Sequence, residues 1–188
     1  MQGNLLIKSG IVALTVASFA AQAEAFVLGG RIVEQNGQGT FVKLDTDKPF
    51  VVGFDTFDDD NLYAFDEDQN IHLKHEIRVD IGGYNGVIET GTVVASHYVF
   101  FDSLQGFHIG FVDFDAPILG IAAQQDTMGA TDFLANTNVT YISPGLRGLE
   151  RGDYVLIDDA DPHRLWVSWA GSSPGDYIRV FTAKSAGM

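Results

Sequence analysis

The chain has no cysteine and few basic residues, and each shortage excludes a class of protein. Without cysteine there are no disulfide bonds, thiolate metal sites or cysteine nucleophiles. Only 11 Lys and Arg residues stand against 25 Asp and Glu, so the formal net charge is -14. A surface of this sign repels nucleic acid and anionic lipid, whereas cations are its natural small partners. After the first 25 residues, no stretch is apolar enough to span a membrane.

What is present indicates a folded β protein. The chain has 188 residues, which suits one domain with a sizeable core. Apolar residues make up 46% and aromatic residues 12%, too much for a disordered chain. The 21 glycines and the 19% of charged residues suit many short strands joined by turns.

The first 25 residues are typical of a secretory signal peptide. Lys8 supplies a positive start, residues 11–21 form a short apolar segment, and A-x-A cleavage sites end at Ala23 and Ala25. The apolar segment is too short to cross a bilayer. We therefore predict that residues 1–25 are removed and that residues 26–188 form a single domain in the periplasm or outside the cell. A buried N-terminal helix is the alternative.

The rest of the chain is organised around residues 91–102, GTVVASHYVFFD. Both faces of this run are apolar, which is typical of a strand buried on both sides. One face carries Val93, Ala95, Val99 and Phe101, and the other carries Val94, Tyr98 and Phe100. Residues 71–81 alternate between apolar and polar, which predicts one half-buried strand with His75 on the apolar side.

Other short apolar runs, separated by turn residues, predict the remaining strands. They are residues 26–34, 50–54, 107–114, 117–123, 154–158, 163–170 and 176–182. Residues 131–135 are expected to form a helical turn with Thr131 as its N-cap. This pattern predicts an all-β fold: an antiparallel β-sandwich, jelly-roll-like, with at most one short helical turn.

Several of these segments form an ordered set of motifs. They are NLYAFDEDQNI from Asn61, GTVVASHYVFFD from Gly91, PILGIAA from Pro117, PGLRGLERGD from Pro144 and SPGDYIRV from Ser173. The set, which covers about residues 55–182, resembles secreted bacterial β-sandwich proteins that often carry a PEP-CTERM sorting tail. The resemblance implies a β domain associated with the cell envelope or with exopolysaccharide. This chain lacks the Pro-Glu-Pro tail after residue 182, so simple secretion is expected.

Residues 45–68 form an acidic stretch interrupted by aromatic rings, which predicts an ordered loop. Asp66, Asp68 and Asn70 give D-x-D-x-N, the first half of a calcium loop. Isoleucine occupies the Gly and Glu positions of an EF-hand, so a site of another kind is expected, with a solvated acidic surface as the alternative. Calcium is the only expected cofactor. Its candidate ligands are Asp55, Asp58, Asp60, Asp66 and Asp68.

Catalytic patterns have little support in the sequence. Ser96 and His97 are neighbours in the central run, and neighbours on a strand point to opposite faces. There is no G-x-S-x-G elbow and no H-E-x-x-H zinc motif. With 25 acidic residues, a pair suited to glycosidase chemistry carries no specificity. We therefore expect no catalytic residue and predict that the protein is not an enzyme.

The expected ligand surface is aromatic. Trp166 and Trp169 are separated by an odd number of positions in one predicted strand, so they point to opposite sides. An exposed indole near Tyr154 or Tyr177 would stack on a sugar ring. We name Trp166, Trp169 and Tyr177 as candidate sugar-stacking residues, with packing in the core as the alternative.

Together these features predict a secreted, acidic, non-catalytic protein with a structural or adhesive role in a bacterial envelope or extracellular matrix. The alternative is a calcium-stabilised carbohydrate-binding module that holds exopolysaccharide. The expected partners are a polysaccharide or other copies of the chain, and nucleic acid is not one. Strand addition along residues 26–34 would be the route to self-association.

Overall fold

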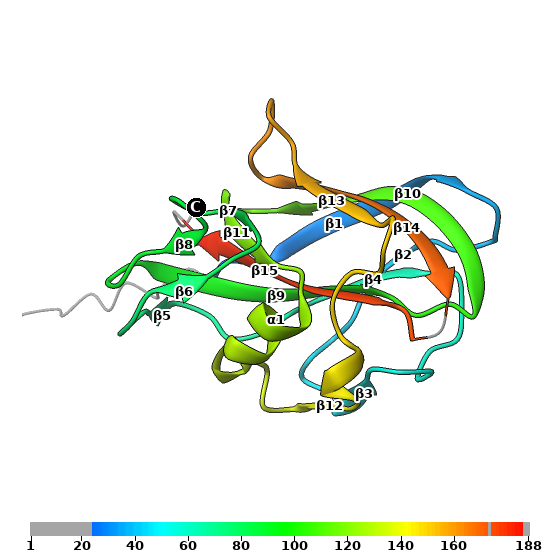
Figure 1. Ribbon diagram of the computed structural model, residues 1–188, viewed down its shortest axis with the longest axis horizontal. Coiled ribbons are helices and arrows are strands. Elements are labelled where there is room, and N and C mark those ends of the chain that lie inside the picture. The colour runs from blue at the N-terminus through cyan, green and yellow to red at the C-terminus, as the bar shows by residue number, and fades with distance from the viewer. Residues whose placement is uncertain (1–23, 173, 186–188) are drawn as a thin grey trace, which may run out of the picture.

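Two β-sheets pack face to face in the computed structural model, which describes residues 24–172 and 174–185 (Figure 1). The four-stranded sheet is antiparallel and has the order β1 (Val27–Gln35), β10 (Gln105–Phe114), β14 (Arg164–Ser172) and β13 (Tyr154–Ile157). The seven-stranded sheet has the order β2 (Phe41–Lys43), β4 (Leu62–Asp66), β9 (Val93–Phe101), β15 (Asp176–Ala183), β11 (Ile118–Ala122) and β7 (Ile81–Gly82), and β5 (Ile71–His72) pairs with β9. The predicted signal peptide lies almost wholly outside the described residues.

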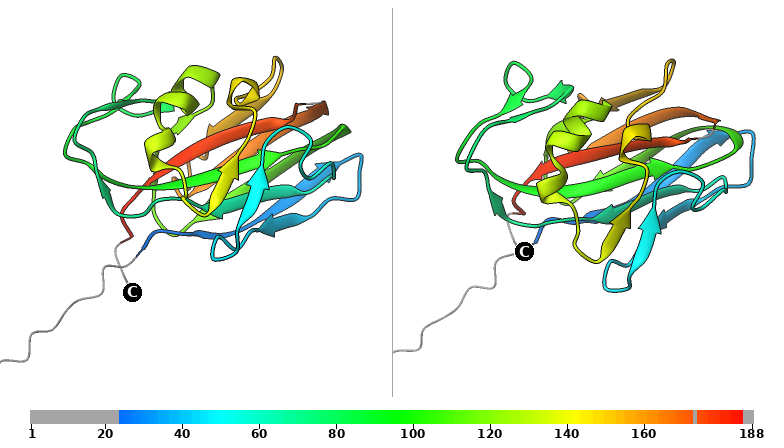
Figure 2. Two further views of the ribbon diagram at one scale, coloured as in Figure 1. Left: turned by 90° about the horizontal axis from the view of Figure 1, so that it is seen from below. Right: turned by 60° about the horizontal axis from the view of Figure 1, so that its bottom comes forward.

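A third, irregular layer covers the other face of the seven-stranded sheet (Figure 2). Its helical parts are α1 (Gln125–Ala130) and the 3₁₀ turns η1 (Asp132–Leu134) and η2 (Pro144–Leu146). Two small strand pairs complete it: β12 (Val139–Tyr141) lies parallel to β3 (Phe50–Val52), and β6 (Ile77–Arg78) lies antiparallel to β8 (Val87–Ile88). No helix among the described residues is long and apolar enough to cross a membrane.

The central strand is confirmed. β9 lies inside the seven-stranded sheet between β4 and β15, and its residues from Val94 to Phe101 are all buried. Val99 and Phe101 belong to the core between the two sheets, whereas Tyr98 and Phe100 belong to the core under the irregular layer. The apolar residues on both faces of this strand follow from its position, because each face packs against a different layer.

Three details differ from the sequence prediction. The strand order does not confirm a jelly roll. The parallel pair β2–β4 makes the seven-stranded sheet mixed, and β12–β3 is a small parallel sheet of its own. Helical content exceeds one turn, because α1 precedes the expected turn at Asp132–Leu134. Residues 71–81 are not one strand: three two-residue strands there pair with three different partners, and His75 is exposed.

Two apolar cores and one small cluster hold the layers together. The core between the sheets includes the buried side chains of Leu165, Val167 and Trp169 from β14. A smaller cluster joins the two ends of the described chain: Ala25 packs with Ala95 and Ala116, and Ala183 packs against them. At the corner between the sheets Gly30 is needed, because a Cβ atom there would lie 2.5 Å from the Phe41 ring.

Candidate functional site

Strand alternation places one set of side chains on the outer face of the four-stranded sheet, away from both cores. Arg31, Phe111, Trp166 and Leu156 pair in one row across all four strands. Ile109, Ser168 and Tyr154 form part of the neighbouring row. We call the residues Ile109, Phe111, Tyr154, Leu156 and Trp166 the aromatic face.

Ring and ion contacts fix the centre of the aromatic face. The Phe111 and Trp166 rings meet edge to face at 5.3 Å between centroids. The guanidinium of Arg164 lies 4.0 Å from the centroid of Phe111 and donates two hydrogen bonds, of 2.7 and 2.9 Å, to Asp113. The Trp166 indole N–H donates to Asp158 at 2.8 Å, and this bond is the main reason that the pKa of Asp158 is lowered. Both polar partners hold the rings in place.

The margins of this face are open to solvent. Tyr154 is 68% exposed and Leu156 is 52% exposed, both on the edge strand β13. On the opposite edge strand β1, Leu28 and Val33 are also exposed. Exposed apolar side chains gathered on a sheet face are typical of a binding surface.

Two of the three predicted sugar-stacking residues lie in the interior. Trp169 is fully buried in the core between the sheets, and Tyr177 is 1% exposed and belongs to the core under the irregular layer. The Tyr177 hydroxyl donates to the carboxylate of Asp102 at 2.8 Å. The prediction that the two tryptophans point to opposite sides is confirmed: Trp169 points inward and Trp166 outward, so of the three candidates only Trp166 can take part in a surface platform.

Three carboxylates gather at the end of β9. Oxygen atoms of Asp55, Asp58 and Asp102 lie within 4.8 Å of one another. Asp102 is 2% exposed and accepts hydrogen bonds from the backbone N–H groups of Thr56 and Phe57 at 2.8 and 2.9 Å. These bonds curl the loop so that Asp55 and Asp58, both at positive φ, face the buried carboxylate. Burial and then the charges of its acidic neighbours raise the pKa of Asp58. Such a set can hold a cation.

The other predicted calcium ligands do not join this cluster. Asp60 accepts hydrogen bonds from the Gln38 backbone and from Ser103. Asp66 accepts a hydrogen bond from His97 at 2.8 Å and forms an ion pair with Lys43 at 2.7 Å. Asp68 is exposed and is not part of the cluster. The D-x-D-x-N pattern therefore gives no converging ligands.

Asp102 is the ligand candidate that the sequence prediction missed. The only sequence signal for Asp102 is that this single carboxylate follows directly on the long apolar run of the central strand. Antiparallel pairing of β4 with β9 places Tyr63 opposite Phe100, which brings the residues before β4 next to Asp102. Without knowing which strands pair, this proximity is not visible in the sequence.

A buried network of charges is a second feature that the sequence did not reveal. Arg179 on β15 and Glu67 after β4 have no side-chain exposure and are joined at 2.6 Å. Glu67 also accepts hydrogen bonds from the hydroxyls of Ser96 and Tyr141. Arg179 donates to the carbonyl of Met128 in α1. The network thus joins the seven-stranded sheet to the irregular layer.

The same network extends to a second arginine. Asp132 accepts a hydrogen bond from Arg179 at 3.1 Å and two bonds of 2.7 Å from Arg147. The two arginines and two carboxylates balance in charge. Both arginines and the buried Glu67 have all their charge paired within the protein, so the network is suited to holding segments in place.

Ser96 and His97 lie on opposite faces of β9, as predicted. Ser96 bonds Glu67 under the irregular layer, whereas His97 bonds Asp66 and Thr182 on the side of the sheet-to-sheet core. The two side chains therefore do not form a nucleophile and base pair.

One carboxyl pair is strongly perturbed. Burial, followed by the charge of Asp153, raises the pKa of Asp176 to about 8, and burial also raises the pKa of Asp153. The backbone N–H of Glu150 donates to one oxygen of Asp176, and the backbone N–H of Ala170 donates to one oxygen of Asp153. Burial and the neighbouring charge both disfavour the ionised form, so Asp176 keeps its proton to a higher pH than an exposed carboxyl does. Asp176 is 1% exposed, which keeps this pair away from a bulky substrate.

Comparison with known proteins gives no relative from which a role can be transferred. No protein-family model, no curated protein and no solved structure gives a significant match to the chain. The resemblance to secreted PEP-CTERM-type proteins stays a prediction, and the function has to be inferred from the residues described above.

Proposed function

We propose that the protein is a secreted, non-catalytic adhesive protein that holds a neutral polysaccharide on the aromatic face. The observation that best supports this proposal is the row formed by Phe111, Trp166 and Leu156 across three strands, with Tyr154 exposed beside it. Sugar rings present flat C–H surfaces that stack on such side chains. Asp113, Arg164 and Ser168 lie in the same area and can exchange hydrogen bonds with sugar hydroxyls.

Charge favours a neutral glycan over an acidic one. The chain carries a net charge of -14, so a polyanion would be repelled on approach. Self-association through the same face is disfavoured for the same reason, since two copies would bring like charges together. Strand addition at β1 is also hindered, because the strand contains two register shifts and side-chain carboxylates already accept from the N–H groups of Phe26 and Val27.

Affinity electrophoresis in gels that contain neutral β-glucans, dextran or alginate tests the proposal. We expect at least one neutral glycan to retard the protein, and alginate to have no such effect. Trp166→Ala and Tyr154→Ala should each weaken binding by about tenfold, the loss of roughly one stacking contact. Tyr84→Ala is the matched control, because Tyr84 is 72% exposed and lies off the aromatic face.

Two outcomes contradict the proposal. One is equal binding by the Tyr154→Ala and Tyr84→Ala variants, since the aromatic face would then have no role. The other is release of reducing ends from a bound glycan, because the protein would then be a hydrolase.

Calcium is the cation we propose for Asp55, Asp58 and Asp102. Oxygen-only ligands on a loop suit this ion, and the buried Asp102 supplies a fixed carboxylate. If the dissociation constant is about 1 mM, 10 mM calcium stabilises the fold by about 1.4 kcal/mol, measured as a rise in melting temperature. Asp58→Asn should remove the rise, whereas Asp159→Asn, outside the cluster, should keep it. Equal effects of calcium on both variants would exclude this site.

We propose that the signal peptide is cleaved after Ala23 and not after Ala25. Ala25 is 1% exposed and packs with Ala95 and Ala116, so cleavage after Ala23 would keep this contact whereas cleavage after Ala25 would remove it. Mass spectrometry of the exported chain would distinguish the two products.

A further inference from the structure

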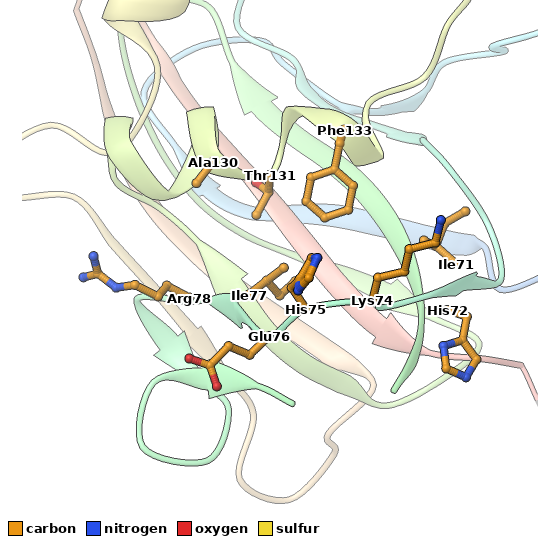
Figure 3. A pocket seen from close by; sticks show the side chains of 10 residues that line it. All are labelled: Ile71, His72, Lys74, His75, Glu76, Ile77, Arg78, Ala130, Thr131 and Phe133. Carbon is orange, nitrogen blue, oxygen red and sulfur yellow. The ribbon is translucent and has the colours of Figure 1, made fainter. Parts of the chain in front are cut away.

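A pocket of about 550 Å³ lies between the segment 71–78 and the end of α1 with η1 (Figure 3). We call it the arm pocket. The segment 71–78 forms one wall, and Ala130, Thr131 and Phe133 form the other. It lies on the side of the irregular layer, so it is separate from the aromatic face. Its volume is in the range of pockets that hold small molecules.

The inner surface of the arm pocket is apolar. Ile77 is buried at its centre, and the Phe133 ring, which is 60% exposed, points from η1 toward the segment 71–78 (Figure 3). Thr131 is the polar side chain of the helical wall, but its hydroxyl donates to the carbonyls of Thr127 and Met128. A ligand here would therefore meet mainly carbon atoms and would need an apolar body.

The rim of the arm pocket carries the opposite charge to the rest of the molecule. Lys74 and Arg78 supply the positive charges within a run of seven residues that also holds His72 and His75, and Glu76 is the one acidic residue among them. In Figure 3 the Lys74 amine lies on the same side as Phe133, whereas the Glu76 carboxylate points the other way. Since the whole chain has a net charge of -14, this rim is a local attraction for an anion on a surface that otherwise repels anions.

We propose that the arm pocket binds a small amphipathic carboxylate. Its aliphatic or aromatic body packs on Ile77 and Phe133, and its carboxylate pairs with the Lys74 amine, while Arg78 adds positive potential from the other end of the pocket (Figure 3). This combination of an apolar interior and a few charged groups at the mouth gives orientation as well as affinity. The proposal does not depend on glycan binding, because the two surfaces share no residue.

Isothermal titration calorimetry with 4-phenylbutyrate tests the proposed carboxylate binding, and 4-phenylbutyramide serves as a neutral ligand of the same shape. We expect saturable binding of one carboxylate per chain and about tenfold weaker binding of the amide. Lys74→Gln/Arg78→Gln should weaken carboxylate binding by about tenfold or more. Lys48→Gln/Arg151→Gln removes the same charge from exposed positions outside the pocket and should change binding by less than about twofold.

A second pair of variants tests the apolar wall. Phe133→Ala should reduce binding of both the carboxylate and the amide, whereas Phe54→Ala, another exposed phenylalanine outside the pocket, should not. The proposal is overturned if no saturable binding is found, or if each pocket variant binds as well as its control. All the altered side chains are exposed, and all except Phe133 and Phe54 are polar, so each variant should keep its fold. Circular dichroism of each variant checks this.

Discussion

The two faces of the seven-stranded sheet are buried by different means. The face toward the four-stranded sheet is packed mainly by aliphatic and aromatic side chains, which alternate along regular strands. The face toward the irregular layer combines apolar packing with the charged network of Glu67, Asp132, Arg147 and Arg179. Regular strands position themselves through their backbone ladders, whereas short helical turns and loops have few such bonds. The comparison indicates that buried ion pairs hold the irregular layer in place where there is no ladder of backbone hydrogen bonds to do so.

The largest expected effect comes from breaking the network on one side. Arg179→Leu leaves the Glu67 carboxylate buried without its cation, which typically costs about 3–5 kcal/mol. Urea denaturation measures the loss in the free energy of unfolding. Hydrogen exchange should show the loss first in α1, whose Met128 carbonyl loses its bond to Arg179.

A double variant distinguishes ion pairing from simple packing. Glu67→Leu/Arg179→Leu removes both charges, so it should cost less than the sum of the two single changes. Strict additivity of the two changes would mean that the pair has no special role in holding the irregular layer.

Leu165→Ala tests the other face with a somewhat smaller effect. Leu165 is fully buried between the sheets, and the cavity left by its truncation should cost about 3 kcal/mol in denaturant unfolding. Combined with Arg179→Leu, the two losses should add to within about 0.5 kcal/mol, since the side chains lie in different layers and share no partner. A larger coupling would show that the two cores behave as one unit.

The smallest expected effect depends on pH. Because the pKa of Asp176 is raised to about 8 from its usual value near 4, the folded state binds more protons between these values, so stability should fall as pH rises from about 4 to about 8. Asp176→Asn keeps a neutral side chain, and it should flatten this slope and stabilise the protein by about 1–2 kcal/mol at pH 8. Asp159→Asn, at an exposed position, should leave the slope unchanged. An unaltered slope in the Asp176 variant would assign the pH dependence to other groups.

Strand positions were readable from the sequence where burial alternates or covers both faces. The central strand, β1, β10, β11, β14 and β15 were expected at nearly the observed residues because their side chains repeat with the period of a strand. The segment 71–81 had the same period, but its backbone pairs with three partners in turn. Periodicity reports which side chains are buried, and it does not report whether the ladder is continuous.

Site residues were harder to predict, because they depend on which strands become neighbours. Asp55 and Asp58 were named, whereas Asp102 lies more than forty positions later and joins them only through the β4–β9 pairing. Trp166 was named with Trp169, and the spacing correctly put them on opposite faces. Which face is outside depends on the second sheet, and no local pattern contains that information.

The alanine cluster has a consequence for how the domain can be built into larger proteins. Ala25 and Ala183 meet there, so the chain enters and leaves at one place. A short linker could close the two ends, and a new break in an exposed turn such as that around Asn85 would give a permuted chain with the same layers. For the same reason the domain can be inserted into a loop of a host protein without increasing the distance between the two ends of that loop.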